Sequence, residues 1–419
     1  MQRVIVVGGG LSGVVTAYEL VHLGYDTLLL EQREGIALET SYANGSLLTP
    51  SMADPWNAPG VYRHLVASLF SRHSAMKLRL SAIPSLAGWG LRFLRHSSVA
   101  LHDAATKASF ALAKYSVERT GELRERLSLR YDATTVGTLK IFRTEAAMEG
   151  SLSVAAKLAP LGLRFQVLDR DGVVADEPAL ADIRDQITGA LRFPDDESGD
   201  AHQFCNQMAT AFVRAGGVIK TNTRVGDIAL ERGSVSGVLI GNRVERADIV
   251  VVAAGNASVQ LVKPLGLSLP IRPAKGYTIT FDTSSIQFRP VIPIIDDALH
   301  AAIVPIGDRL RVAGTAEFAG NNQRIRKDRV ENLLGLLATV LPRVAEKLSY
   351  ETAQPWAGLR PMSADGLPFI GPTHLRGLYV NTGHGHLGWT LAAGSACLLG
   401  GLVGGAVPDI DPTPYRATR

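Results

Sequence analysis

Cysteine is scarce in this chain of 419 residues, which contains only Cys205 and Cys397. Two distant thiols cannot form the disulfide framework that stabilises small secreted domains, so we predict free thiols in a reducing compartment. An excess of charge is also lacking, because 43 Lys and Arg stand against 39 Asp and Glu and leave a net charge of +4. This balance argues against a nucleic-acid-binding protein.

Long hydrophobic runs are few. The apolar run from Val4 to Val7 is too short for the core of a signal peptide. Residues 389–407 form an uncharged stretch of 19 residues, which is near the minimum for a membrane-spanning helix. Five glycines interrupt this stretch, so we predict a buried helix and a turn rather than a span.

The composition is that of a packed globular protein, with 46% apolar and 20% charged residues. The length suits two domains, because a single domain usually holds about 100–200 residues.

The first residues predict a dinucleotide-binding unit. A β-branched run at Val4–Val7 is followed by Gly8, Gly10 and Gly13 in G-x-G-x-x-G spacing, then by a helical pattern and a second strand that ends at Glu31. The glycines permit a tight turn and close approach of pyrophosphate, and the helix N-terminus favours phosphate charge. Glu31 is placed to accept ribose hydroxyls and would repel a 2′-phosphate. The residues assigned to the cofactor here are Gly8, Gly10, Leu11, Ser12, Gly13, Glu31, Gln32 and Arg33.

This unit alone does not separate FAD from NAD. There is no second G-x-G-x-x-G unit, so a separate NAD domain is not expected. We predict an α/β fold in which a Rossmann-type FAD-binding domain (1–60, 196–262 and 356–419) is interleaved with an α+β substrate domain on a mixed sheet (61–195 and 263–355). The site should lie between the two domains.

Several runs resemble the small-subunit family of bacterial D-amino acid dehydrogenase, within the D-amino acid oxidase, glycine oxidase and sarcosine oxidase superfamily. They are T-S-Y-A-N-G from 40, D-P-W-N-A-P-G from 54, G-T-L-K-I-F-R-T from 137, P-D-D-E-S-G-D from 194, K-G-Y from 275, G-L-R-P from 358 and N-T-G-H-G-H-L-G-W-T from 381. The resemblance implies FAD as cofactor and a quinone or another membrane acceptor for the electrons. It also implies a cytoplasmic location, with the cytoplasmic face of the inner membrane as a second option.

The expected reaction is oxidative deamination of a small D-amino acid. A hydride would pass from Cα to flavin N5, and water would hydrolyse the imino acid to a 2-oxo acid and ammonia. A hydroxyproline or other imino-acid dehydrogenase or oxidase on the same scaffold is an alternative. A non-catalytic flavoprotein subunit of a membrane complex is another.

The substrate carboxylate needs a cation, and arginine can bind it at two points. Arg360 matches the arginine that has this role in the superfamily. Tyr277 is the candidate for a second contact, with a core tyrosine as the alternative. His384 is the third catalytic candidate, although a histidine that only caps the turn is an equal alternative. We name no catalytic base.

The flavin ring needs close-fitting loops and a positive dipole near N1 and O2, which we expect from a helix starting at Trp389. The run from Gly383 to Thr390 should supply both features. The resemblance places a second loop beside the ring, and a third segment near adenine. The residues assigned on these grounds are Ser41, Asn44, Gly45, Val225, Ala254, Gly255, Gly358, Arg360, Gly383, His384, Gly385, His386, Leu387, Gly388, Trp389 and Thr390.

Two charge patterns remain. Asp195, Asp196, Glu197 and Asp200 are close enough in sequence for a metal site, but we interpret them as the N-terminal cap of a helix near Ala201 and predict no metal. Residues 61–96 contain no acid, and basic residues alternate with apolar ones there. This segment is either a helical lid over the substrate or a surface that contacts an anionic membrane.

Overall fold

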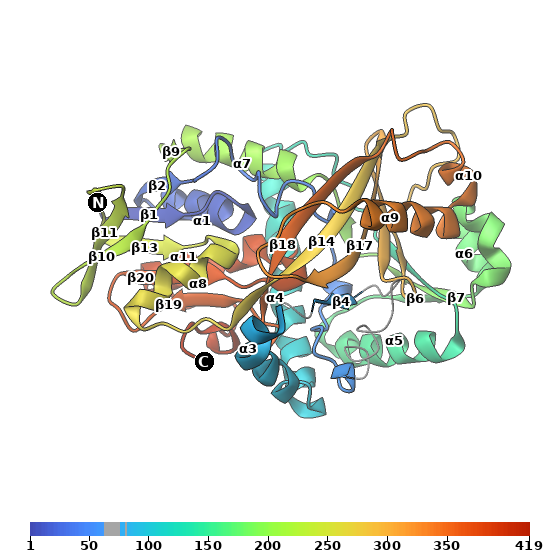
Figure 1. The fold of residues 1–419 in the computed structure, drawn as a ribbon, viewed down its shortest axis with the longest axis horizontal. Helices are drawn as coiled ribbons and strands as arrows, with labels where there is room; N and C mark the ends of the chain where they lie inside the picture. Colours follow the sequence, from blue (N-terminus) through green and yellow to red (C-terminus); the bar gives the residue numbers. More distant parts are fainter. Residues whose placement is uncertain (63–75, 80–81) are drawn as a thin grey trace.

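The computed structural model describes residues 1–62, 76–79 and 82–419. Two large sheets lie side by side, one at each end of the molecule (Figure 1). The chain crosses between them several times, and both termini lie at the end that holds the first sheet.

The first sheet has six strands in the order β19-β20-β13-β1-β2-β9, with only β19 antiparallel to its neighbour. This is the arrangement of a Rossmann-type domain. Its strands are β1 (Arg3–Val7), β2 (Asp26–Leu30), β9 (Val218–Lys220), β13 (Ile249–Val252), β19 (Phe369–Pro372) and β20 (Leu378–Thr382).

Helices cover one face of this sheet and a small sheet covers the other. The side chains of β1 alternate between the two sides: Val4 and Val6 pack under the helices, and Ile5 and Val7 pack toward the small sheet. Burial on both faces explains the unbroken apolar run in the sequence. The helices are α1 (Leu11–His22), α4 (Val99–Arg126), α7 (Ala201–Arg214) and α11 (Ala392–Gly404).

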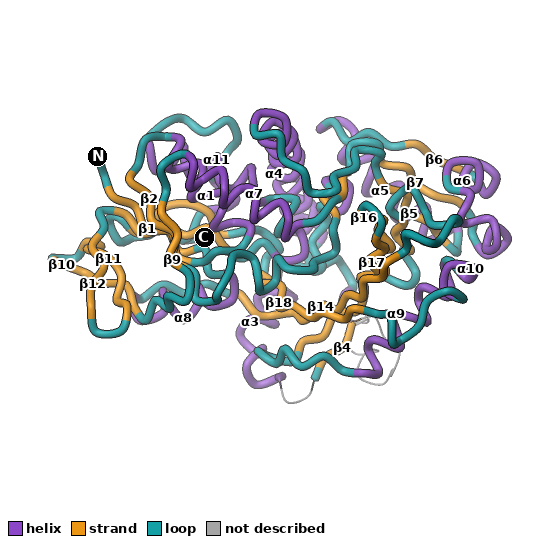
Figure 2. The backbone as a smooth tube through the Cα atoms, turned by 90° about the horizontal axis from the view of Figure 1, so that it is seen from above, coloured by secondary structure: helices purple, strands orange, loops and turns teal. Residues whose placement is uncertain are grey.

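The small antiparallel sheet lies at the outer end of the molecule (Figure 2). It consists of β10 (Asp227–Glu231), β11 (Ser234–Ile240) and β12 (Arg243–Arg246), with α8 (Ser258–Val262) nearby.

The second large sheet has nine strands and is mixed. Its order is β18-β14-β17-β16-β15-β5-β7-β6, and β4 also pairs with β17. The strands are β4 (Met76–Leu78), β5 (Thr138–Phe142), β6 (Gln166–Leu168), β7 (Gly189–Phe193), β14 (Ile271–Asp282), β15 (Ile294–Asp296), β16 (Ala301–Ile306), β17 (Arg309–Phe318) and β18 (Gln354–Ser363).

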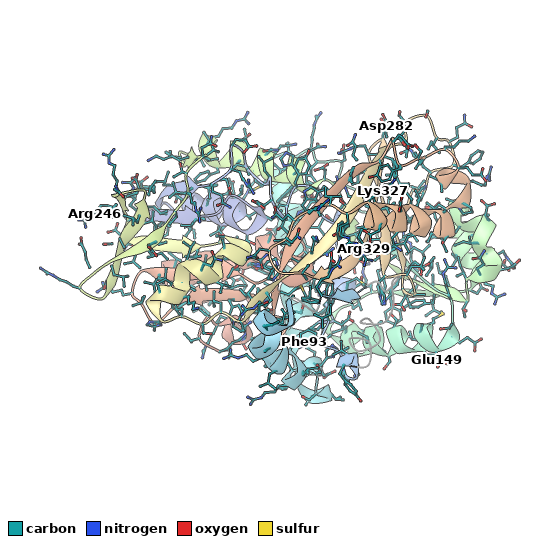
Figure 3. The ribbon with its side chains drawn as sticks, in the orientation of Figure 1. Phe93, Glu149, Arg246, Asp282, Lys327 and Arg329 are labelled. Atoms are coloured by element: carbon teal, nitrogen blue, oxygen red, sulfur yellow. The ribbon has the colours of Figure 1, made fainter. Side chains whose placement is uncertain are left out.

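Helices at the far end of the molecule close the core of this second sheet. Lys327 and Arg329 mark α9, and Glu149 marks α5, while Arg246 lies at the opposite end (Figure 3). A two-stranded ribbon of β3 (Leu47–Leu48) and β8 (Glu197–Ser198) completes the fold. The helices at this end are α5 (Glu145–Leu158), α6 (Arg170–Asp176), α9 (Lys327–Val340) and α10 (Pro342–Ala345), whereas α3 (Ile83–Arg95) packs against Phe318 nearer the middle of the molecule (Figure 1).

The predicted fold class is confirmed. The domain limits remain a prediction, and the positions of β18 and α4 differ from the limits we expected. The boundary expected at residue 356 falls inside β18, which belongs to the nine-stranded sheet. The helix α4, which we assigned to the substrate domain, packs against α11 beside the six-stranded sheet. The segment 61–96 is not helical throughout, because residues 76–78 form a strand.

The uncharged C-terminal stretch is a buried helix and not a span. Most residues of α11 are buried between α1 and α4. In the part of the chain that the structure describes, no helix is both long and apolar enough to cross a bilayer.

Candidate active site

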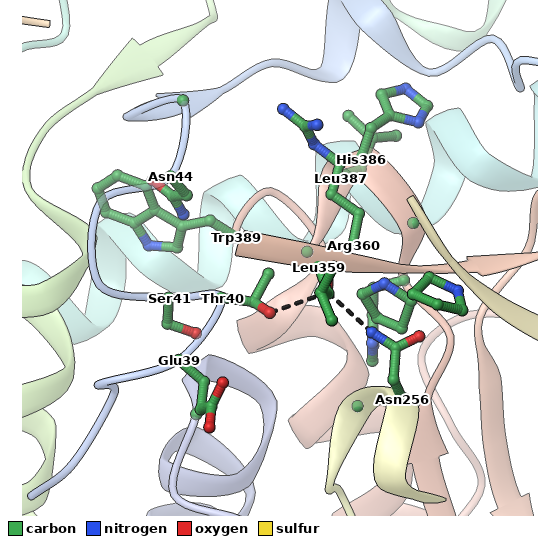
Figure 4. Close-up of a pocket in the computed structure, with 18 of the residues that line it drawn as sticks. Glu39, Thr40, Ser41, Asn44, Asn256, Leu359, Arg360, His386, Leu387 and Trp389 are labelled. Atoms are coloured by element: carbon green, nitrogen blue, oxygen red, sulfur yellow. Dashed lines mark hydrogen bonds between the residues drawn. The ribbon is translucent and has the colours of Figure 1, made fainter. Parts of the chain in front are cut away.

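A cavity of about 1580 Å³ lies between the two large sheets, and segments from both line it. Figure 4 shows part of its wall. Most of the residues that the sequence assigned to the cofactor or the substrate line this cavity. They are Gly8, Gly10, Leu11, Ser12, Glu31, Gln32, Ser41, Asn44, Gly45, Val225, Ala254, Gly255, Arg360, His384, Gly385, His386, Leu387, Gly388 and Trp389.

The dinucleotide end of the cavity depends on two glycines. Gly8 has φ +110°, a backbone conformation that side chains rarely allow. A Cβ on Gly13 would lie 1.8 Å from the carbonyl oxygen of Gly8, so only glycine lets α1 approach β1 this closely. Gly13 itself does not line the cavity, because its role is this contact between helix and strand.

The carboxylate of Glu31 organises the same turn. One of its oxygens accepts the N–H of Gly9 at 2.6 Å and the other accepts the N–H of Arg33 at 2.8 Å. Each oxygen has a further lone pair, so both can still accept ribose hydroxyls. Arg33 does not line the cavity, and its side chain pairs with Glu39, which does, so the structure gives Arg33 no direct place at the cofactor site.

Ser41 contacts the start of α1 at the nucleotide end of the cavity. Its hydroxyl accepts the N–H of Leu11 at 3.2 Å, which caps the start of α1. The N–H groups of Ser12 and Gly13 follow in the first turn, where a helix provides no internal partner. The placement of Ser41 beside the isoalloxazine stays a prediction.

These features fit FAD. A glycine cradle that a Cβ would fill, a helix N-terminus and a ribose-binding carboxylate are present together in one cavity. The residues that would hold the adenosine and the pyrophosphate are Gly8, Gly10, Ser12, Glu31, Ser41 and Val225.

Arg360 is the main cation at the other end of the cavity. Its Nη1 is buried and has no hydrogen-bond partner among the described residues. Burial, the cause of the shift, lowers the pKa of this guanidinium to about 10, so Arg360 is still a cation at neutral pH. A buried cation of this kind needs an anion, and a bound carboxylate would supply it.

Gly276 makes room for this guanidinium. The strand pairs place Ala274 opposite Arg360, and Gly276 two residues further along β14. A Cβ on Gly276 would lie 1.9 Å from Nη1 of Arg360 and 2.4 Å from its Cζ. The side chain of Arg360 therefore lies flat over the strand at this glycine.

An aromatic wall stands beside Arg360. The Cζ of Arg360 lies 6.0 Å from the ring centre of Trp56, and the same ring stacks on His386 at 5.3 Å. The Nε2 of His386 is 3.2 Å from the carbonyl oxygen of Met52, to which it donates. Burial and then the charge of Arg360 lower the pKa of His386, so this histidine is neutral at pH 7.

His384 holds the C-terminal run in place. Its two ring nitrogens lie 3.4 Å from the hydroxyl of Ser12 and 3.1 Å from the hydroxyl of Ser395. Burial lowers the pKa of His384 to about 4, so the ring is neutral. With both nitrogens close to serine hydroxyls, His384 joins α1 to α11, which favours the capping alternative, and its catalytic role stays a prediction.

Tyr277 does not reach the cavity. It is 1% exposed, and its hydroxyl donates to Glu317 at 2.9 Å. Glu317 also pairs with Lys275 and Arg79 inside the protein. The core alternative is therefore correct for Tyr277, because Ala274, Gly276 and Thr278 alternate with it along β14 and the glycine is the residue beneath Arg360.

Four more assigned residues have packing roles. The hydroxyl of Thr390 accepts the N–H of Thr49 at 3.0 Å. The glycines at 358 and 383 lie where a Cβ would meet the Trp356 ring or the core side chains of Ile271 and Phe369. Trp389 lines the cavity but packs against Tyr131 and Phe204, and the helix that we expected to start there begins at Ala392.

Two side chains join the loops of the first domain to β18. The carbonyl oxygen of Leu359 accepts hydrogen bonds from Thr40 at 2.9 Å and from Asn256 at 2.8 Å (Figure 4). In the second loop, Asn44 uses its Oδ1 to accept the N–H of Ser46, so it shapes the loop. These contacts hold Arg360 at a fixed distance from the nucleotide end.

Each of the four acids in this cluster has its own partner within the protein. Asp200 caps α7 by accepting the N–H groups of His202 and Gln203, which confirms the predicted cap. Glu197 pairs with Arg124 and Asp195 pairs with Arg164. Asp196 is buried and accepts hydrogen bonds from Ser51 and Thr138.

Asp196 should make stability depend on pH. Burial raises its pKa from 3.8 to about 7, so the folded protein keeps a proton that the unfolded chain releases. The free energy of unfolding should therefore fall as pH rises from about 4 to about 7, by up to roughly 4 kcal/mol. In Asp196→Asn the free energy of unfolding should no longer fall with pH in this way. Urea unfolding measured between pH 5 and 8 tests this.

A surface variant is the control for this measurement. Asp185→Asn removes a carboxylate that is 84% exposed, and it should keep the slope of the parent protein. An unchanged slope in Asp196→Asn would contradict the prediction.

Sequence reasoning missed several residues of the wall. Trp56 lies in a run quoted for its resemblance, but no role was assigned to it. Gly276 was quoted in the same way; it does not line the cavity but lies beneath Arg360. Asn256 and Thr315 also line the cavity, and neither belongs to a recognisable motif.

Comparison with known proteins identifies the family of the chain. Residues 3–402 match the family described as FAD dependent oxidoreductase, so the chain belongs to that family and uses FAD. It is 38% identical to a D-amino acid dehydrogenase from Rhizobium johnstonii and 37% identical to one from Bradyrhizobium diazoefficiens, over 99–100% of all the chains.

Solved structures show the same fold. Glycine oxidase from Geobacillus kaustophilus has a TM-score of 0.77 at 23% identity, over 100% of this chain and 99% of that chain. L-proline dehydrogenase from P. horikoshii has a TM-score of 0.79 at 16% identity, over 100% and 97%.

Proposed function

We propose that the protein oxidises a D-amino acid to the 2-oxo acid and ammonia, as an FAD-dependent dehydrogenase. The observation that carries this proposal is the buried Nη1 of Arg360, which has no hydrogen-bond partner among the described residues and belongs to a side chain that lines the same cavity as the nucleotide cradle. Full-length relatives at 37–38% identity carry the name D-amino acid dehydrogenase, which supports the substrate class.

The chain binds and orients the substrate in this proposal. Arg360 holds the carboxylate, and the Trp56–His386 wall restricts the side of the cavity beside it. FAD, when bound, would supply the two-electron acceptor for oxidation of the substrate at Cα. Both histidines of the C-terminal run are neutral, so they add no second cation next to the carboxylate.

An imino acid is the second candidate substrate. The structural similarity to an L-proline dehydrogenase favours it, because a secondary amine can be oxidised on the same scaffold. A carboxylate clamp serves both substrates equally, so Arg360 does not choose between them.

Anaerobic reduction of the purified flavoprotein tests the proposal. D-Alanine or another D-amino acid should bleach the visible flavin bands, and the L-enantiomer should not. Bleaching by hydroxyproline, by a glycine derivative or by L-amino acids alone would move the substrate assignment. Turnover of the same panel with oxygen and with an artificial quinone identifies the acceptor, and we expect the quinone to be faster.

We further propose that α3 brings the protein to an anionic membrane, where a quinone acceptor resides, at the cytoplasmic face. Leu91 and Leu94 are 74% and 45% exposed on α3, and Arg92 and Arg95 lie in its last turn. Residues 55–102 contain no acid. Apolar side chains with cations between them suit a negatively charged headgroup layer.

The inner side of the segment 61–96 packs against the rest of the protein. Trp89 and Phe93 pack toward Phe318, and Arg79 pairs with Glu317, so these residues do not face a membrane. Ser85 lines the cavity, which also supports the lid interpretation. Arg63 and Arg72 lie outside the described residues.

Vesicle sedimentation tests the surface. The double variant Arg92→Glu/Arg95→Glu should bind vesicles of phosphatidylglycerol at least about tenfold more weakly, because each cation near such a surface contributes about 1 kcal/mol. Arg246→Glu, on β12 at one end of the molecule and away from Phe93 of α3, should bind as the parent does (Figure 3). Equal binding of all three proteins would refute the membrane surface.

A further inference from the structure

Thr315 occupies a strained position in β17. The pairing of β14 with β17 changes register at this point: Gly276 pairs with Ala316, but Tyr277 pairs with Gly314, so Thr315 is an extra residue in a β-bulge. Its φ of +55° lies in the left-handed region. A β-branched residue is disfavoured there, and such strain is concentrated at functional sites.

The hydroxyl of Thr315 lacks a partner. The residue is 6% exposed, and its Oγ1 has no hydrogen-bond partner among the described residues. Leaving a buried hydroxyl unpaired costs about 1–3 kcal/mol. Thr315 lines the cavity, so a molecule bound there is the partner that would remove this cost.

Thr315 is close to the carboxylate-binding cation. The guanidinium of Arg360 lies over Gly276, and Gly276 pairs directly with Ala316, the neighbour of Thr315. Adjacent strands are separated by about 5 Å, so one strand spacing separates the guanidinium from this part of β17. A carboxylate bound to Arg360 on that side would lie within reach of a threonine side chain.

We propose that Thr315 is a substrate-binding residue, which donates its hydroxyl to the carboxylate that Arg360 holds. This takes the place that we expected for Tyr277, whose own hydroxyl is committed to Glu317. The inference rests on the proposed function, because it assumes that the ligand of Arg360 is the carboxylate of an amino acid. With this proposal, the bulge of β17 contributes a residue that selects the substrate.

The test compares Thr315→Ser with Thr315→Ala in the holoenzyme. The two variants differ only in the hydroxyl, and neither has a branched Cβ, so their backbone strain is similar. Benzoate, a carboxylate without an amine, is titrated while the flavin absorbance is followed, and benzamide serves as the uncharged control ligand. Flavin content and thermal unfolding are measured for each variant.

Thr315→Ser should bind benzoate within about threefold of the parent, and Thr315→Ala should bind it about 10-fold more weakly or worse, as expected for loss of a hydrogen bond to a charged group. Benzamide should bind all three proteins alike, and the KM for the amino acid should rise in Thr315→Ala more than kcat falls. Equal benzoate affinity of the Ser and Ala variants would overturn the proposal. If no amino acid reduces the parent flavin, the proposed function fails, while the benzoate comparison still decides the role of Thr315.

Discussion

Arg360→Ala is expected to lower kcat/KM by about 100-fold to 10,000-fold with FAD still bound. The estimate assumes the loss of two charge-assisted hydrogen bonds of about 1.5–3 kcal/mol each. Nothing in the described part of the chain pairs with Nη1, so its removal leaves no protein carboxylate unbalanced. Steady-state kinetics and the visible flavin spectrum measure the two parts of this prediction.

Arg360→Lys refines the prediction. Lysine keeps the charge but not the planar fork, so this variant should fall between the parent and Arg360→Ala. Arg343→Ala, which removes an exposed guanidinium from α10, should keep the parent's activity. A yellow Arg360→Ala protein with full activity would refute the role of Arg360. If Arg360→Ala is yellow but has lost turnover, the protein is an enzyme and not a flavoprotein subunit that only carries electrons.

Gly13→Ala is expected to weaken FAD binding by about 100-fold and to lower the melting temperature. The new Cβ would lie 1.8 Å from the carbonyl oxygen of Gly8, and both partners belong to rigid backbone. The helix α1 must therefore move away from β1, and overpacking of this kind costs about 1–3 kcal/mol. The flavin-to-protein ratio after gel filtration and the thermal unfolding curve are the measurements.

A second glycine in a helix provides a matched control. Gly401 lies inside α11, and a Cβ built on it meets nothing within 4 Å. Gly401→Ala should leave FAD bound and should stabilise the protein slightly, because alanine favours helix by about 1 kcal/mol. If Gly13→Ala is as yellow and as stable as Gly401→Ala, the close contact of helix and strand is not needed for the cofactor.

The site combines a rigid half with a half that depends on the second sheet. Glu31, Gly8 and Ser41 fix the nucleotide end through contacts within the first domain. Arg360 and Thr315 come from the nine-stranded sheet, and the contacts of Thr40 and Asn256 with Leu359 join the two halves. Substrate contacts can therefore change with the second sheet while the cofactor end stays the same.

The sequence by itself determined the features that depend on neighbours along the chain. The turn from Gly8 to Gly13 and Glu31 at the end of the second strand were recognisable because a strand, a glycine turn and a helix follow one another locally. The cap at Asp200 and the buried helix near the C-terminus were predictable for the same reason. Arg360 was identified through a short run that resembles a known family.

Only the tertiary structure decided which way the strand residues face. Tyr277 looked like a substrate contact in the sequence, but its face of β14 packs on Glu317, and the neighbouring glycine supports Arg360 instead. Thr315 carries no motif, because a β-bulge arises from the pairing of two strands about 40 residues apart in the chain. Register is set by packing between distant segments, and a shift of one residue exchanges the faces of a strand, so local patterns do not contain this information.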